Sequence, residues 1–162
     1  MKSEGEVMAI GSNFKESLQK AMRGLEIGSS GFESPEQAKN IKAIKPRLIT
    51  PTPERLWFIG EAFRKNMDIN EIQAFTGIDL WFLKEVQEII YYEKIIKSKN
   101  FLSSKDLFLE AKNIGFSDKR IAELTGKSEK DIRAKRRRLK IKPVFKRVDT
   151  CAAEFETSTA YM

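Results

Sequence analysis

Apolar residues recur every three or four positions along most of this chain, which is the spacing of one face of an α-helix. Eight stretches of this kind carry start and stop signals at their ends. In the longest, the apolar positions cover a wide arc, so we expect that helix to lie at the centre of the fold. The predicted helices span residues 14–27, 34–45, 53–65, 68–76, 80–97, 105–113, 117–125 and 128–140.

The segments outside these helices are short. Val7–Ile10 is a brief apolar run that predicts a strand or an extended tail, and residues 144–150 have the same character. Pro51 and Pro53 predict an extended connector over residues 47–53, because proline disfavours the helical interior. The pattern therefore predicts an irregular all-α domain of about seven or eight helices, with short extended stubs at both ends.

One local pattern occurs twice, 49 residues apart. Ile72, Thr76-Gly77, Asp79 and Leu83 align with Ile121, Thr125-Gly126, Ser128 and Ile132. In each copy a short helix ends at glycine, which accepts a left-handed backbone, and Asp or Ser then caps the next helix. We expect two helix-turn-helix corners.

The second corner is also typical of a DNA-binding helix-turn-helix, with residues 128–140 as the recognition helix. Residues 127–147 contain eleven Lys or Arg and only two acids. However, Glu129 and Asp131 lie in the first turn of that helix, where they would face phosphates or base edges. The first corner, moreover, lacks a basic second helix. DNA binding therefore remains an alternative here. The other interpretation is that the basic residues form a surface that is solvated or packs against protein.

Composition excludes several kinds of chemistry. The chain has no histidine and one cysteine, Cys151, which removes Ser-His and Cys-His nucleophiles, histidine-containing zinc sites and internal disulfides. Glu85 and Glu88 are expected on a solvated helix face rather than as a catalytic pair, and no phosphate-binding glycine loop occurs. We therefore assign no catalytic, cofactor-binding or metal-binding residue.

Apolar stretches are too short to span a membrane, and no signal-peptide pattern begins the chain, so the expected location is the cytoplasm. Two aromatic pairs, Trp57-Phe58 and Trp81-Phe82, have helical spacing and are expected in the core. Tyr91 and Tyr92 are the candidate subunit-interface residues. They are adjacent on a helix and must point in different directions, so at most one of them suits the core.

Several motifs resemble the large subunit of carbamoyl-phosphate synthase. Residues 5–11 and 16–26 look like the end of its first synthetase unit, and residues 146–155 with 159–162 look like the opening of its second. Between them, residues 55–59, 78–83, 115–122 and 143–147 resemble the helical oligomerisation domain that joins the two units. Ser12 departs from the pattern, which usually has Arg after the glycine.

The resemblance implies three segments: a stub of the first ATP-grasp unit at 1–11, the oligomerisation domain at 12–142 and a stub of the second unit at 143–162. It also implies that Met1 is not the natural start and that the chain continues beyond Met162. The full enzyme would be a ligase that makes carbamoyl phosphate from bicarbonate, glutamine and two ATP, for arginine and pyrimidine synthesis. Its ATP, Mg²⁺ or Mn²⁺ and K⁺ sites would lie outside this chain, which alone would catalyse nothing.

The partners that the resemblance implies are the other domains of the same large subunit, further large subunits and a small glutaminase subunit. The small subunit need not contact this domain. Because the resemblance accounts for the sequence without nucleic acid, it also weakens the DNA-binding interpretation.

Overall fold

The computed structural model describes residues 6–145, and within this range it contains eight α-helices, one short 3₁₀-helix and no strand. The predicted all-α class is therefore confirmed. Residues 7–10 are extended, while most of the second predicted stub lies outside the described residues. The elements are α1 (Phe14–Gly24), α2 (Ile41–Ile49), α3 (Arg55–Arg64), α4 (Ile69–Thr76), α5 (Leu80–Ile96), η1 (Phe101–Ser103), α6 (Lys105–Ile114), α7 (Asp118–Thr125) and α8 (Glu129–Arg138).

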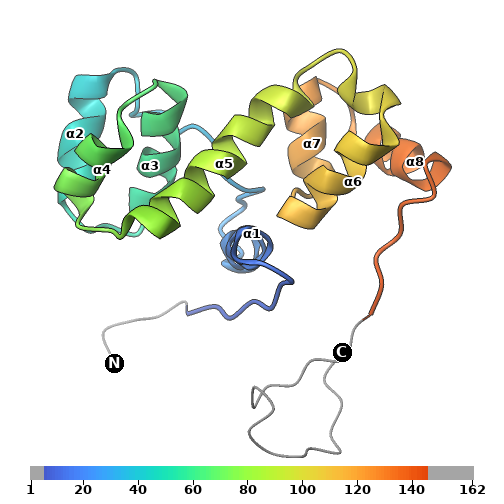
Figure 1. Ribbon diagram of the computed structural model, residues 1–162, viewed down its shortest axis with the longest axis horizontal. Helices are drawn as coiled ribbons and strands as arrows, with labels where there is room; N and C mark the ends of the chain where they lie inside the picture. The colour runs from blue at the N-terminus through green and yellow to red at the C-terminus, as the bar shows by residue number, and fades with distance from the viewer. Residues whose placement is uncertain (1–5, 146–162) are drawn as a thin grey trace, which may run out of the picture.

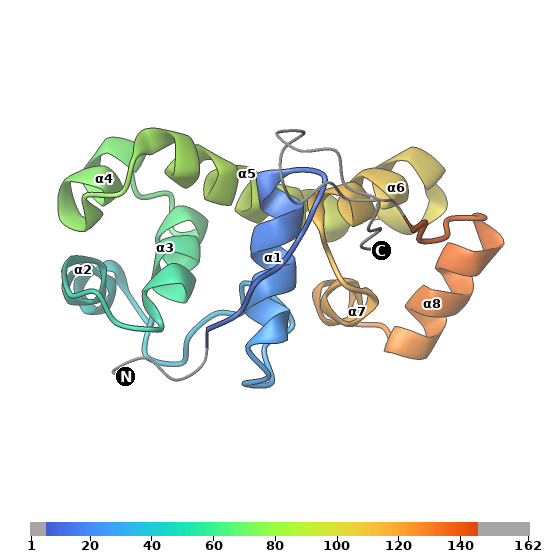
Figure 2. The same ribbon diagram turned by 90° about the horizontal axis from the view of Figure 1, so that it is seen from below.

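The helices form two groups joined by α5. Helices α2, α3 and α4 lie at one end of the molecule and α6, α7 and α8 at the other, while α5 runs between them (Figure 1). Helix α1 lies across the middle, against α5 and α6 (Figure 2). As the wide apolar arc predicts, α5 is central and contacts α1, α3, α4, α6 and α7. Its buried side chains are Leu83, Val86, Ile89, Ile90, Tyr92, Glu93 and Ile96.

The repeated sequence folds into two equivalent corners, α4–α5 and α7–α8. Gly77 and Gly126 both have left-handed backbones, with φ of 68° and 65°. The preceding Thr76 and Thr125 each donate a hydroxyl hydrogen bond to the carbonyl four residues earlier, at 2.8 and 2.7 Å. The isoleucine and leucine positions shared by the two copies are buried in both. The helix-turn-helix prediction is thus confirmed twice.

The structural repeat is longer than the sequence motif that predicts it. Helices α3 and α6 both end on a left-handed residue, Asn66 (φ 57°) in one and Gly115 (φ 105°) in the other. In both, the following amide, of Met67 or Phe116, donates to the carbonyl five residues earlier at 3.0 Å, which is the Schellman closure of a helix. The helices α3–α4–α5 and α6–α7–α8 are therefore two copies of one three-helix unit.

Two predicted helices have different bounds in the structure. The first ends at Gly24 instead of continuing to residue 27, because Glu26 turns the chain with a positive φ of 56°. The second was expected over 34–45 but begins at Ile41, where Asn40 caps it by accepting from the amide of Ala43 at 3.0 Å. Pro35 instead starts a turn, its carbonyl accepting from Ala38.

The predicted end of that second helix before Pro46, and the extended connector from residue 47, are also wrong. Helix α2 continues through Pro46 to Ile49 because Ile44 and Leu48, on either side of the proline, are both fully buried. Burial of two such side chains stabilises the fold by a few kcal/mol, which offsets the hydrogen bond that proline cannot donate.

Gly115 gives a test of how closely α1 packs on the second unit. A Cβ at this position would lie 2.8 Å from Cα of Glu16, and φ is positive. We expect Gly115→Ala to reduce the free energy of unfolding by more than about 2 kcal/mol, from backbone strain and overpacking together. Urea unfolding of the chain measures this.

Gly126→Ala is the matched control, because its φ is also positive but a Cβ there meets nothing within 4 Å. Its free energy of unfolding should fall only by the cost of the backbone strain, about 1 kcal/mol. Equal losses for the two variants would show that α1 does not press on Gly115.

Candidate functional site: a buried ion network between the two units

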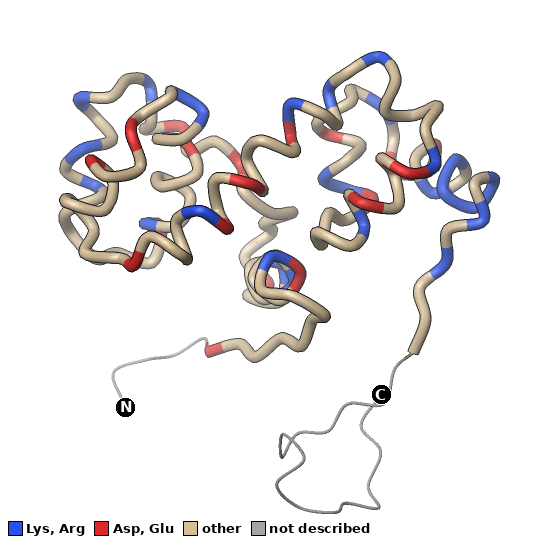
Figure 3. The backbone as a smooth tube through the Cα atoms, viewed as in Figure 1, with Lys and Arg blue, Asp and Glu red and all other residues tan. Residues whose placement is uncertain are grey.

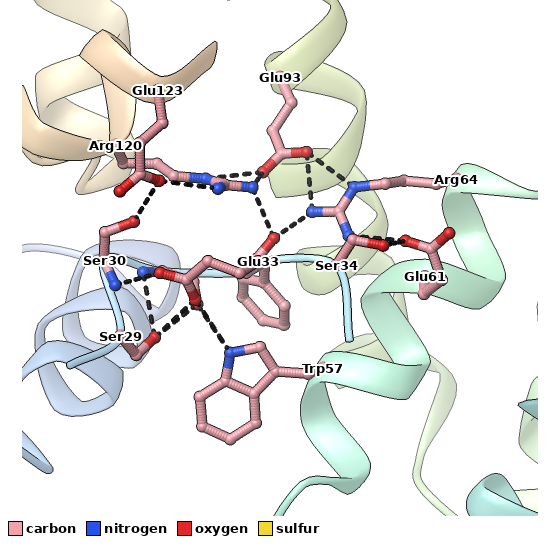
Figure 4. Close-up of polar contacts among 12 residues, drawn as sticks. Ser29, Ser30, Glu33, Ser34, Trp57, Glu61, Arg64, Glu93, Arg120 and Glu123 are labelled. Atoms are coloured by element: carbon pink, nitrogen blue, oxygen red, sulfur yellow. Dashed lines mark hydrogen bonds and ion pairs between the residues drawn. The ribbon is translucent and has the colours of Figure 1, made fainter. Parts of the chain in front are cut away.

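A buried carboxylate is held between two guanidinium groups (Figure 4). Glu93, in the last turn of α5, is only 2% exposed. One carboxylate oxygen, Oε1, accepts from Nη2 and Nε of Arg120 at 2.6 and 3.2 Å. The other, Oε2, accepts from Nε of Arg64 at 2.9 Å and lies 2.8 Å from its Nη2. Because Arg64 is on α3 and Arg120 on α7, Glu93 joins the two units.

Both guanidinium groups also hold the loop between α1 and α2. Nη2 of Arg120 donates to the carbonyl oxygen of Phe32 at 2.6 Å, and Nη2 of Arg64 donates to the same oxygen. The Phe32 ring is fully buried. The loop is therefore fixed at its centre by the same pair of arginines that fixes the two units.

The network ends on a serine at each side. Arg64 donates to Glu61 at 3.1 Å, and Glu61 accepts from the hydroxyl of Ser34 at 2.8 Å. On the other side Arg120 donates to Glu123 at 3.1 Å, which accepts from the hydroxyl of Ser30 at 2.6 Å. Each arginine is three residues from its second glutamate on the same helix, the spacing that places two side chains on one face.

Glu33 forms a neighbouring cluster within the loop itself. Its carboxylate accepts from the backbone amide of Ser30, from the hydroxyl of Ser29 at 2.7 Å and from Nε1 of Trp57 at 3.2 Å. Nε1 of Trp57 also donates to the carbonyl of Gly31 at 2.9 Å. The indole of the first predicted aromatic pair is thus half-buried against this loop, while Phe58 lies in the core as expected.

Burial and hydrogen bonding act in opposite directions on these charges. Burial of Glu33 raises its pKa, but hydrogen bonds from Ser30 and Ser29 outweigh it and lower the pKa to about 2. Burial likewise opposes the charge of Arg120, but the adjacent Glu93 more than compensates and its pKa is raised. Glu33 and Arg120 therefore stay ionised at neutral pH.

Every charged group in this network is already paired, so the arrangement can orient helices but presents no free nucleophile or base. Within residues 6–145 no group of three or more His, Cys, Asp or Glu is placed to hold a metal ion. No helix in that range is long and apolar enough to cross a membrane. Cys151 lies outside the described residues.

Sequence analysis missed this network, although one signal was present. Glu93 falls in step with Ile89, Ile90 and Ile96 on the buried stripe of α5. A charged residue in such a stripe needs a buried partner of opposite sign. The pattern alone does not identify which of the many Lys and Arg residues supplies it.

A second buried carboxylate holds the basic helix α8 in place. Asp118, at the start of α7, accepts from Nε of Arg136 at 2.9 Å and from Nζ of Lys112 at 2.9 Å. Burial raises the pKa of Asp118, but these two cations lower it further than burial raises it. Arg136 also donates to the carbonyl of Ile141 at 3.1 Å. One of the four consecutive basic residues is therefore a packing residue.

The remaining cations of α8 and the segment after it follow one another at one end of the molecule (Figure 3), and most of them are exposed. Glu129 and Asp131 lie in the first turn of α8, and Glu129 pairs with Arg133. Among residues 6–145, no contact or geometry supports the DNA-binding alternative.

The side chains of the two tyrosines proposed from sequence point in different directions, as their adjacency on a helix requires. Tyr92 is 4% exposed, and its hydroxyl donates to the carbonyl of Leu107 at 2.9 Å, beside Glu110 at 3.0 Å. Tyr91 points the other way and is 62% exposed. It borders a hollow of about 460 Å³ formed by the end of α3, the start of α4 and the middle of α5.

The second aromatic pair is not in the core, contrary to expectation. Trp81 and Phe82 are 53% and 45% exposed. They lie in the first turn of α5, where their rings pack against Phe14 of α1 on one side, and Leu83 is the buried residue of that turn.

Comparison with known proteins gives a consistent result. The sequence profile of the family described as "Carbamoyl-phosphate synthetase large chain, oligomerisation domain" matches residues 6–140. All of the chain aligns with the carbamoyl phosphate synthase large chain of Buchnera aphidicola subsp. Acyrthosiphon pisum at 51% identity, covering 15% of that relative. The large chains of Pseudomonas aeruginosa and Ralstonia nicotianae are 46% and 45% identical over the whole chain, which covers 16% and 15% of them.

The ion network predicts that a small change at Glu93 lowers the free energy of unfolding substantially. Glu93→Gln preserves the shape but leaves the buried Arg120 and the partly buried Arg64 without their shared counter-charge. Breaking a buried pair in this way costs about 3 kcal/mol or more of unfolding free energy, which chemical denaturation measures. Glu129→Gln, which removes an exposed pair on α8, should cost under about 0.5 kcal/mol. Similar small losses for both would mean that Glu93 does not stabilise the fold through its charge.

The depressed pKa of Glu33 predicts an acid-dependent loss of stability. The folded pKa is about 2 against a usual 4.5, so the unfolded chain binds the proton more readily. The contribution of Glu33 to the free energy of unfolding is complete above pH 4.5 and disappears as the pH falls from there towards 2. Unfolding free energies measured across this range should decrease less steeply in Glu33→Gln than in the unchanged chain. An identical slope would contradict the assignment.

Proposed function

We infer the function of this chain from one premise: it belongs to the family of the carbamoyl-phosphate synthetase large-chain oligomerisation domain. The observation that carries the inference is the match of residues 6–140 to that family. The chain spans 15–16% of the length of the curated relatives it matches. We propose that it is the structural domain of a full-length large chain, where it joins two synthetase units and contributes to self-association.

The buried network supports an architectural role. A domain that separates two catalytic units must keep its own two ends in a fixed relation, which requires that its parts do not slide. Glu93 ties α3 and α7 to the same point of α5, and Phe32 is held by both arginines. Ionic contacts with fixed directions restrict such a joint more than apolar contacts alone, which are non-directional.

The proposed segments follow the resemblance. Residues 1–11 would end the first ATP-grasp unit, residues 12–142 form the helical domain, and residues 143–162 begin the second unit. Helices α1 to α8 all fall within 12–142. The first and last parts of the two stubs, residues 1–5 and 146–162, lie outside the described residues.

The activity belongs to the full-length protein in this proposal. It would make carbamoyl phosphate from bicarbonate, glutamine and two ATP in the cytoplasm, for arginine and pyrimidine synthesis, with a small glutaminase subunit. ATP and its metal ions would bind in the units on either side.

For self-association we propose the face of α5 around Tyr91. A two-fold symmetric interface places the same patch of two copies together, so a projecting side chain and the hollow that receives it must lie on one face. Tyr91 projects beside the hollow lined by Met67 and Ile90, with Glu88 and Lys94 at the same face. Tyrosine is also enriched at interfaces. Tyr92 would act indirectly, by fixing α5 against α6.

Tyr91→Asp in the full-length protein tests this interface. A charge buried at the centre of a contact is costly, so we expect the dissociation constant of the assembly to rise at least about tenfold, the equivalent of 1.4 kcal/mol. Sedimentation across a concentration series measures it. Leu109→Asp, at an exposed apolar position on α6, is the control and should leave association unchanged. An unchanged assembly in Tyr91→Asp would place the interface elsewhere.

A further inference from the structure

Helix α1 completes the end of α6 from outside that helix. The last carbonyl groups of an α-helix have no hydrogen-bond donor within the helix itself. At the end of α6, the carbonyls of residues 113–115 accept hydrogen bonds from the side chains of Asn13, Gln19 and Arg23, at 3.0, 3.1 and 2.8 Å respectively. All three donors belong to α1 or to its N-cap, so this end of α6 depends on the position of α1.

The first three-helix unit lacks this arrangement. In the repeat, the end of α3 is equivalent to the end of α6, and residues 64–66 correspond to residues 113–115. Within the described residues 6–145, no group donates to the carbonyls of residues 64–66. The three-helix unit therefore closes without such donors, and those at α6 are an addition that attaches α1 to the second unit.

The chain that enters the domain is tied to α1. Nζ of Lys20 donates to the carbonyl of Ile10 at 3.0 Å. The backbone amide and the hydroxyl of Ser12 donate to the carboxylate of Glu16 at 2.6 and 2.8 Å. A displacement of the entering chain therefore acts directly on α1.

The chain that leaves the domain is held from the same end of α6. Lys112, in the last turn of α6, donates to the carbonyl of Phe116 at 2.6 Å and to the carboxylate of Asp118 at 2.9 Å. Asp118 also accepts from Arg136, whose Nη1 donates to the carbonyl of Ile141 at 3.1 Å. The amide of Ile141 donates in turn to the carbonyl of Arg136 at 3.1 Å. The leaving chain is therefore fixed by a side chain whose position depends on the α6–α7 turn.

The charges at this turn lie between the two ends of the domain. Burial lowers the pKa of Lys112, Asp118 raises it, and the cations Arg136 and Arg23 lower it again, so the pKa is lowered overall. The ammonium group is thus within electrostatic reach of α1 through Arg23 and of α8 through Arg136. Because these like charges repel, a displacement of Arg23 alters the most favourable position of Lys112, which in turn holds Asp118.

We propose that these contacts form a relay, running from α1 over the end of α6 and Asp118 to Ile141, that couples the order of the entering chain to that of the leaving chain. This rests on the proposed function, in which the two chains lead to the first and the second synthetase unit. A change at the end of the first synthetase unit would then alter the start of the second. Coupling between distant sites is carried by contiguous contacts of this kind.

Hydrogen exchange of the full-length protein, read by mass spectrometry, tests the relay. Gln19→Met removes the donor to the carbonyl of residue 114 and keeps an unbranched side chain at a fully buried position. Oε1 of Gln19 has no hydrogen-bond partner among the described residues, so its loss costs no contact. Exchange of residues 139–141 should rise several-fold, although the substitution is on α1. Unchanged exchange there would overturn the relay.

Ile72→Val is the matched control, because it shortens a fully buried side chain of α4 in the first unit. Among residues 6–145, no hydrogen bond or ion pair joins α4 to α1 or to α8. The variant should lower stability and yet leave exchange of residues 139–141 unchanged. A similar rise in both variants would show that exchange reports a general loss of stability, which would also contradict the relay.

The reverse substitution gives a second test, because coupling between two sites is reciprocal. Arg136→Met should raise exchange of residues 12–17 several-fold, whereas Arg137→Met, at an exposed neighbouring position, should not. In the double variant with Gln19→Met, exchange of residues 139–141 should rise by less than the product of the two single effects, because either substitution already interrupts the relay. A full product would mean two independent local effects and no relay.

Sedimentation of the same variants separates this proposal from the proposed subunit interface. Neither Gln19 nor Arg136 lines the hollow beside Tyr91, so self-association should be the same in every variant of the relay. Association in Tyr91→Asp bears on the interface alone, and exchange at the two chain ends bears on the relay alone. Failure of one proposal is therefore distinguishable from failure of the other.

Discussion

The arrangement of this domain depends on one carboxylate, that of Glu93, which is shared by Arg64 and Arg120. Moving an ionised carboxylate out of water costs several kcal/mol, which only close opposite charges and hydrogen bonds can offset. Each of its oxygens faces one guanidinium, so both arginines must be present together. Because these arginines come from α3 and α7, the charge is satisfied only when the two units take one position along α5.

The duplicated unit explains why such a joint is needed. The buried residues of both copies belong to one core, and α5 serves as the last helix of the first copy while also packing against α6 and α7 of the second. A shared helix connects the copies but leaves them free to differ in tilt. The loop carbonyl of Phe32, which accepts from both arginines, removes this freedom, and α1 packs across the junction.

Local signals predicted most of the fold because they act within one helical turn. Asp68, Asp79, Ser104, Ser117 and Ser128 each cap the helix that follows, and these helices begin within one or two residues of expectation. The prediction failed where tertiary burial overrode local preference, as at Pro46 between buried Ile44 and Leu48. The network itself was out of reach, since Glu93 meets its partners 29 and 27 residues away.

The same reasoning separates the interior of the domain from its surfaces. A buried salt bridge is weak support for stability by itself, because well-packed apolar side chains often serve as well. Its advantage is direction: a carboxylate between two guanidinium groups accepts one geometry, whereas an apolar contact tolerates small shifts. A catalytic domain needs such precision around its substrate. Here the buried charged groups of the joint are instead paired with each other, and exposed apolar side chains such as Trp81 and Tyr91 lie on the surface. Directional contacts at this joint suit the role proposed for the domain, which is to hold other domains in place.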